Sequence, residues 1–88
     1  VDIDWEYPGV CGNNPACGAS AADTANFTGL VQEFRSQLDS IGAQNGKHYL
    51  LTFAASAGQE KFGKIQLSTV AQSFDWINIM TYDFYGAW

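Results

Sequence analysis

Acidic and apolar side chains alternate along residues 1–8, the first segment of the chain. In an extended strand, residues two apart point to the same face, so Asp2, Asp4 and Glu6 would form a column with neighbours roughly 7 Å apart. Stacked carboxylates are one means by which proteins keep a carboxylic acid protonated near neutral pH. The alternatives are a solvated strand face and a metal site. Pro8 ends the strand directly after Glu6, at the end where parallel α/β folds carry their chemistry.

A loop and then an amphipathic helix follow this acidic segment. The loop covers residues 9–22 and is rich in Gly, Asn, Pro, Ala and Ser. We expect Ser20 or Asp23 to cap the helix at its start and Gly42 to end it. Apolar residues recur at helical spacing and predict one buried stripe. The stripe consists of Phe27, Leu30, Val31, Phe34, Leu38 and Ile41.

The rest of the chain predicts two more strands and one more helical region. Residues 49–57 are mostly apolar, which is typical of a strand buried on both faces. Residues 59–74 carry a weaker helical pattern in which Ser68 is an internal cap, and residues 75–83 form the third strand. Strands and helices that alternate with single connections make parallel βαβ units with right-handed crossovers. The sequence therefore predicts an α/β fold.

The third strand is expected to end at the same edge of the sheet as the first. If Met80 and Tyr82 point to the same side as the acidic column, the Tyr82 hydroxyl and Asp83 lie beside Glu6. Ala54, on the middle strand, is small and leaves space between them. Taken alone, Met80 or Tyr82 would be interpreted as a core residue. Together with the carboxylates they predict the floor of a pocket.

Charge and cysteine content argue against several classes of partner. A net charge of −5 with only four basic residues argues against nucleic acid, and no apolar run is long enough to span a bilayer. Cys11 and Cys17 cannot complete a zinc site unaided, and His48 stands alone, so no metal is expected. A disulfide across the loop is the better interpretation and indicates an oxidising, extracellular setting. Asn26 begins a glycosylation sequon, but buried Phe27 within it disfavours its use.

Two motifs resemble the family-18 glycoside hydrolases, specifically the chitinases. They are Val-Asp-Ile-Asp-Trp-Glu-Tyr-Pro at residues 1–8 and Met-Thr-Tyr-Asp at residues 80–83. Leu-Thr-Phe-Ala-Ala-Ser-Ala-Gly and the closing Phe-Tyr-Gly-Ala-Trp are similar to the secreted bacterial and fungal enzymes. The resemblance implies a (β/α)8 barrel, the TIM-barrel fold, of at least ~250 residues, of which this chain would supply strands four to six and the two intervening helices.

Residues 1–88 are therefore expected to be an internal fragment of a single catalytic barrel domain. The chain opens without Met inside a predicted strand, and the Asp-Gly that precedes the family motif is missing. The other five strands and the tryptophan of the last strand are missing as well. We expect the 88 residues alone to be inactive, because the pocket needs walls from strands that they do not contain.

The resemblance implies a catalytic role for five residues. Glu6 would be the general acid/base, and the N-acetyl oxygen of the substrate itself would attack the anomeric carbon with retention of configuration. Asp4 would accept a hydrogen bond from the acetamido N–H, and Asp2 would hold a proton and relieve the repulsion on Asp4. Tyr82 and Asp83 would fix the acetamido group for in-line attack.

Four further residues would bind the sugar. Met80 and Ala54 would floor the acetyl methyl, Trp88 would stack on a sugar on the leaving-group side, and Tyr7 would border the same cleft. The implied partner is chitin or its oligosaccharides, without cofactor, metal, nucleic acid or membrane, in a secreted enzyme that is monomeric at full length. The alternatives are an endo-β-N-acetylglucosaminidase that acts on glycans and a non-catalytic chitin-binding lectin. The presence of Glu6 counts against the lectin.

Overall fold

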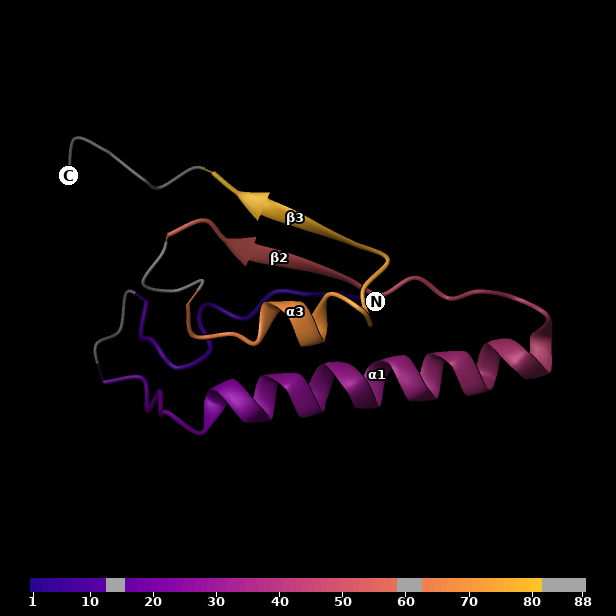
Figure 1. Ribbon diagram of the computed structural model, residues 1–88, viewed down its shortest axis with the longest axis horizontal. Coiled ribbons are helices and arrows are strands. Elements are labelled where there is room, and N and C mark those ends of the chain that lie inside the picture. The colour runs from indigo at the N-terminus through magenta and orange to yellow at the C-terminus, as the bar shows by residue number, and fades with distance from the viewer. Residues whose placement is uncertain (13–15, 59–62, 82–88) are drawn as a thin grey trace.

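The computed structural model describes residues 1–12, 16–58 and 63–81 (Figure 1). Strands and helices alternate along the chain, as the sequence predicts. The elements are β1 (Asp2–Ile3), α1 (Asp23–Asn45), β2 (Thr52–Ser56), α3 (Leu67–Val70) and β3 (Trp76–Met80). The strands are shorter than predicted, because the apolar pattern continues into segments that do not pair with a neighbouring strand. In particular, Asp4 and Glu6 follow β1 and do not belong to it.

The three strands form one parallel sheet in the order β1-β2-β3. Ile3 pairs with Phe53, and Phe53 pairs in turn with Ile77, so these three side chains point to one face of the sheet. The intervening positions, such as Asp2 and its partner Thr52, point to the opposite face. The parallel α/β arrangement is therefore confirmed.

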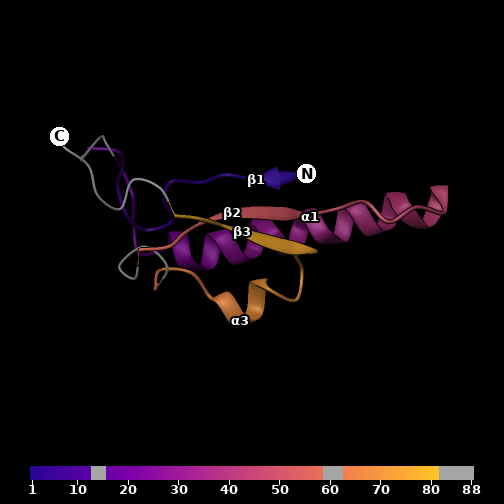
Figure 2. The same ribbon diagram turned by 90° about the horizontal axis from the view of Figure 1, so that it is seen from above.

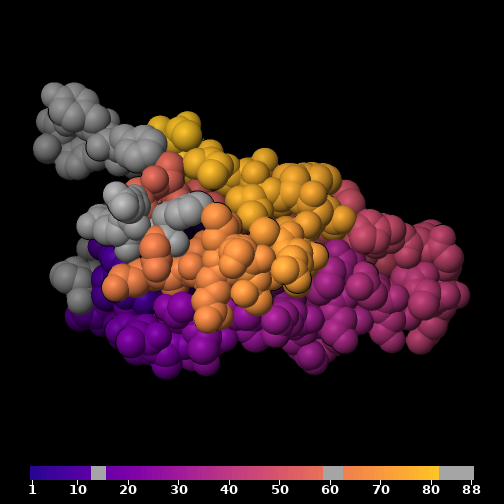
Figure 3. All heavy atoms as spheres, in the orientation of Figure 1, coloured from indigo at the N-terminus to yellow at the C-terminus, as the bar shows by residue number. Residues whose placement is uncertain are grey.

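Both helices cover the Ile3 and Phe53 face of the sheet. α1 lies along most of the long axis of the molecule (Figure 2), and α3 with its flanking turns lies between α1 and β3 (Figure 3). The buried core comprises Ile3, Phe27, Val31, Leu51, Phe53, Ala55, Val70 and Phe74. Burying each large apolar side chain of this set stabilises the fold by about 1.5–3 kcal/mol relative to exposure.

Aromatic rings form a continuous row through this core. The ring centroids of Phe27 and Phe53 lie 4.9 Å apart, and those of Phe53 and Phe74 lie 5.5 Å apart. Trp5 joins the row with a centroid 5.8 Å from that of Phe27. These distances lie within the range in which aromatic pairs attract one another beyond their buried area. The row connects the segment after β1 to α1, β2 and the turn before β3.

The ends of α1 differ from the prediction. Neither Ser20 nor Asp23 caps the helix: the cap position is Ala22, which makes no side-chain hydrogen bond there. Gly42 does not end the helix, which continues to Asn45 and closes with Gly46 in the left-handed conformation, at φ 68°. Gly42 is needed for packing, because a side chain there would collide with the Lys47 carbonyl, which the chain brings back onto the helix.

Two other details of the helices were predicted wrongly. Ser68 lies inside α3 and is not its cap, since the cap position is Gln66. Leu30 and Ile41 of the predicted stripe are 42% and 48% exposed, because they lie on flanks of α1 that the described part of the sheet does not reach. Phe27 and Val31 of the same stripe are fully buried, as expected.

Asp75 joins three segments at the N-terminal edge of the sheet. Its carboxylate accepts hydrogen bonds from the Leu51 amide at 2.8 Å and from Arg35 Nη1 at 3.1 Å, and it pairs with His48 Nε2 at 2.5 Å. The side chain of His48 is 61% exposed, so His48 is a surface residue that pairs with Asp75. The hydrogen bond with His48, followed by that from the Leu51 amide, lowers the pKa of Asp75 from 3.8 to about 2. Arg35 also donates to the Tyr49 carbonyl at 2.7 Å, so α1 is fixed to the start of β2.

We expect Asp75→Asn to lower the stability of the protein in a pH-dependent way. Because the pKa of Asp75 is lower in the folded than in the unfolded chain, its stabilisation is present above pH about 4 and is lost as the pH falls towards 2. The urea midpoint of Asp75→Asn should therefore lie below that of the wild type at pH 7, and the gap should narrow below pH 4.

A control is available in Asp39→Asn. Asp39 pairs with the same Arg35 at 2.7 Å, but its side chain is 57% exposed, so its removal should have a small effect. Equal midpoint losses for the two variants, or a gap for Asp75→Asn that stays constant down to pH 2, would contradict the role assigned to Asp75.

Candidate active site

The candidate site lies at the C-terminal edge of the sheet and has two parts: side chains on the face that α1 and α3 leave uncovered, and a hollow beside Glu6 next to the start of α1. β2 and β3 end at this edge, on the left of Figure 1, and the segment after β1 runs towards it, since β1 itself ends opposite Phe53. The register places Asp2, Ala54 and Met80 on this face, because Asp2 pairs with Thr52, and Ala54 and Met80 follow at even steps on β2 and β3. Ala54 and Met80 are half-buried, whereas Asp2 and Asp4 are exposed.

Thr52 orients Asp2 and was not recognised from the sequence. Its hydroxyl donates a 2.7 Å hydrogen bond to Asp2 Oδ1 across the two strands, and Thr52 itself is only 7% exposed. The bond fixes the carboxylate in one orientation at the base of the site. A threonine at the start of the mostly apolar β2 was the available signal, but its partner lies fifty positions away and depends on the strand register.

Glu6 lies beside an open hollow of about 220 Å³. The residues that line this hollow are Trp5, Glu6, Tyr7, Cys17, Gly18, Ala19 and Asp23. Glu6 itself is exposed, Tyr7 is half-buried, and the peptide bond between them is cis. The Trp5 ring packs on Phe27 in the core, which fixes the backbone next to Glu6. The carboxyl group of Glu6 is therefore accessible to a ligand, and the contact of Trp5 with Phe27 fixes the backbone beside it.

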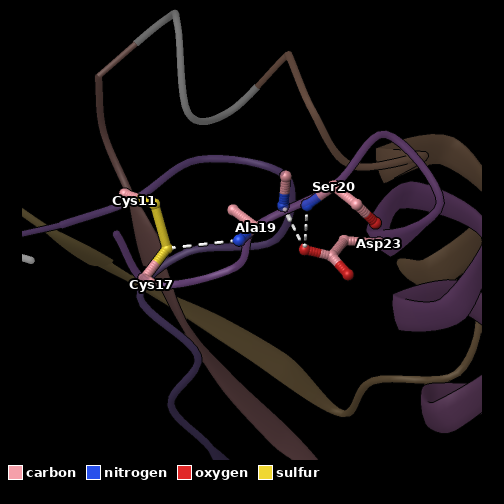
Figure 4. The surroundings of a disulfide bond; sticks show 6 residues. Cys11, Cys17, Ala19, Ser20 and Asp23 are labelled. Carbon is pink, nitrogen blue, oxygen red and sulfur yellow. Dashed lines mark hydrogen bonds between the residues drawn. A yellow bond between two sulfur atoms is a disulfide. The ribbon is translucent and has the colours of Figure 1, made fainter. Parts of the chain in front are cut away.

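A disulfide closes the loop on the other side of the hollow. Cys11 and Cys17 are joined, with their Cα atoms 5.7 Å apart, and Cys17 Sγ accepts a hydrogen bond from the Ala19 amide at 3.3 Å (Figure 4). Asp23 lies at the base of this loop and accepts hydrogen bonds from two of its amides. The sequence suggested Asp23 only as a helix cap, so its role in the loop was missed.

Three residues predicted for the site, Tyr82, Asp83 and Trp88, lie outside the described residues. The described part of the chain contains no group of three or more His, Cys, Asp or Glu residues that could hold a metal ion. Among the described helices, none is both long and apolar enough to cross a membrane. Of the five residues predicted to be catalytic, the described ones are Asp2, Asp4 and Glu6.

Comparison with known proteins identifies the family. Residues 1–88 match the Glycosyl hydrolases family 18, and the chain therefore belongs to this family. Chitinase A of Pseudoalteromonas piscicida is 46% identical over 88 residues, which are the whole of this chain and 11% of that protein. The chain thus spans only about a ninth of this curated relative.

Solved structures agree with this assignment. Chitinase ChiA74 from Bacillus thuringiensis superposes with a TM-score of 0.90 at 48% identity, over 99% of this chain and 14% of that one. A mutant class V chitinase from Nicotiana tobaccum, solved in complex with NAG4, superposes with a TM-score of 0.74 at 34% identity, over 97% of this chain and 22% of that one.

Proposed function

We propose that residues 1–88 form part of a single catalytic (β/α)8 barrel in which β1, β2 and β3 are strands four to six. Parallel strands with both helices on one face are the repeating unit of such a barrel. In the described chain, β1 and β3 are the edges of the sheet, and closure with further strands would satisfy their unpaired backbone groups. The uncovered face, which carries Asp2, Ala54 and Met80, would then line the barrel interior.

The proposed activity is the hydrolysis of β-1,4-linked N-acetylglucosamine in chitin and its oligomers. The position of Glu6 carries this proposal: it is an exposed carboxylic acid at the C-terminal edge of a parallel sheet, beside an open hollow. Relatives named chitinases and a relative solved with NAG4 support this substrate class. The Cys11–Cys17 disulfide supports a secreted protein, and a monomer is sufficient because one barrel would hold the whole site.

In the proposed mechanism, Glu6 is the general acid and later the general base. It donates its proton to the glycosidic oxygen as the bond from this oxygen to the anomeric carbon breaks. The acetamido carbonyl oxygen of the substrate attacks the anomeric carbon from the opposite face and forms a cyclic intermediate, so no enzyme carboxylate becomes covalently linked. Glu6 then takes a proton from a water molecule that opens this intermediate from the side of the departed group.

Asp4 and Asp2 would support the acetamido nucleophile. Asp4 follows β1 between Asp2 and Glu6, and would accept a hydrogen bond from the acetamido N–H, which makes the carbonyl oxygen a better nucleophile. Asp2, whose carboxylate accepts the hydrogen bond from the Thr52 hydroxyl, would share a proton with Asp4. The carboxyl groups thus act in sequence from the base of the site towards the substrate.

The remaining predicted residues would position the sugar. Ala54 and Met80 lie on the uncovered face of the sheet and would contact the acetyl methyl, and Tyr7 borders the hollow beside Glu6. Tyr82 and Asp83 follow Met80 closely in the chain and would orient the acetamido group, while Trp88 would stack on a sugar on the leaving-group side. Correct orientation of the nucleophile is a large part of the rate advantage in such a reaction.

Replacement of Glu6 by Gln in the full-length protein should reduce kcat on a soluble N-acetylglucosamine oligomer by about two to four orders of magnitude. The amide keeps the shape of the side chain but cannot donate the proton, so binding of the oligomer should persist. Glu33→Gln is the matched control, because Glu33 is exposed on α1 and its carboxylate accepts a hydrogen bond from Gln37 of the same helix at 2.9 Å. Near wild-type turnover by Glu6→Gln would contradict the assignment of the acid.

The proposed route also predicts the stereochemistry of the product. Two successive inversions at the anomeric carbon give net retention, so the first product observed by NMR should be the β-anomer. A thiazoline analogue of the cyclic intermediate should inhibit. If the α-anomer forms first, a base-activated water must attack directly and the substrate-assisted route is wrong.

A further inference from the structure

One carboxylate oxygen binds both ends of the disulfide loop, by which we mean residues 9–20 around the Cys11–Cys17 bond. Asp23 Oδ2 accepts a hydrogen bond from the Gly9 amide and another from the Ser20 amide, each at 3.1 Å (Figure 4). Asp23 is half-buried at the first position of α1, so it is fixed by a long and well-packed helix. Hydrogen bonds to an ionised carboxylate are stronger than those between neutral groups. Asp23 therefore determines how closely residues 9 and 20 approach each other.

The loop in turn supports the aromatic ring next to Glu6. A Cβ atom placed on Gly12 would lie 3.4 Å from Tyr7 Cε2, so the loop backbone packs directly on this ring. The Val10 amide also donates to the Tyr7 carbonyl at 3.4 Å. Gly18 and Ala19, at the other end of the loop, line the hollow together with Tyr7. The position of the loop therefore sets the width of the hollow beside Glu6.

We propose that Asp23 is a positioning residue of the active site, which holds the disulfide loop and Tyr7 against the sugar that Glu6 protonates. This inference rests on the proposed function. Asp23 does not touch the reacting atoms; it acts through the loop. Loss of its carboxylate would release the two ends of the loop and move the loop backbone away from the Tyr7 ring. The contacts between Tyr7 and the sugar would then weaken equally in the bound state and in the transition state. Such a loss raises KM and leaves kcat unchanged.

Three substitutions separate this role from a simple effect on helix stability. Asp23→Ala removes the acceptor. Asp23→Glu keeps the negative charge at the start of α1, where it favours the helix, but displaces the oxygen from the two amides. Asp23→Asn keeps an oxygen in the original place without the charge. Glu33→Gln, which removes an exposed carboxylate of the same helix, is the control.

The measurements are KM and kcat of the full-length protein on a soluble fluorogenic N-acetylglucosamine oligomer, with hydrogen exchange of the peptide that covers residues 9–20. We expect Asp23→Ala and Asp23→Glu to raise KM by about five- to tenfold with kcat within about twofold, and to speed exchange in the loop. Asp23→Asn should lie closer to the wild type than either. The Glu33→Gln control should match the wild type in all three quantities.

Two results would overturn the inference alone. One is that the wild type is active and the Asp23→Ala variant has the same KM as the wild type. The other is full rescue by Asp23→Glu, which would reduce the role of Asp23 to the charge at the start of the helix. A wild-type protein that fails to hydrolyse the oligomer would overturn the proposed function itself, and the inference with it. The two failures are thus distinguished by the wild-type rate.

Discussion

The contact between Phe27 of α1 and Phe53 of β2 is the interaction on which the rest of the structure depends. It fixes the long helix to the central strand, and Trp5 and Phe74 extend it on either side into one row of rings. Because Trp5 immediately precedes Glu6, the same core that stabilises the fold also fixes the backbone of the proposed catalytic acid. Truncation of Phe27 would therefore disturb both stability and the site.

The N-terminal and C-terminal edges of the sheet have different roles. At the N-terminal edge, Asp75 joins Arg35, His48 and the Leu51 amide, and these bonds connect α1 to the starts of β2 and β3. At the C-terminal edge, Asp4 and Glu6, the carboxylates proposed for the reaction, are exposed. This division is typical of (β/α)8 barrels, in which the N-terminal face supports stability and the C-terminal face supports catalysis.

The sequence predicted the features that depend on local pattern. Alternation at two residues gave the strands and the shared face of Asp2, Ala54 and Met80, and spacing at three to four residues gave the buried side of α1. The parallel sheet followed from the order of the elements. These features needed no knowledge of which distant residues meet.

The features that the sequence did not predict depend on distant contacts. The Thr52 bond to Asp2 and the three partners of Asp75 join positions 24 to 50 residues apart, which no local pattern reveals. Gly42 was mistaken for the end of α1 because a glycine near the end of a helical pattern is usually a cap. Here Gly46 has that role, and Gly42 accommodates the returning Lys47 carbonyl.

The most direct test of the central claim is a crystal structure of the full-length Glu6→Gln protein with a tetramer of N-acetylglucosamine. We predict that the amide of the substituted side chain lies about 2.6–3.2 Å from a glycosidic oxygen, with the acetamido group of the adjoining sugar facing Asp4. An oligomer bound away from the C-terminal edge of the sheet would contradict the account.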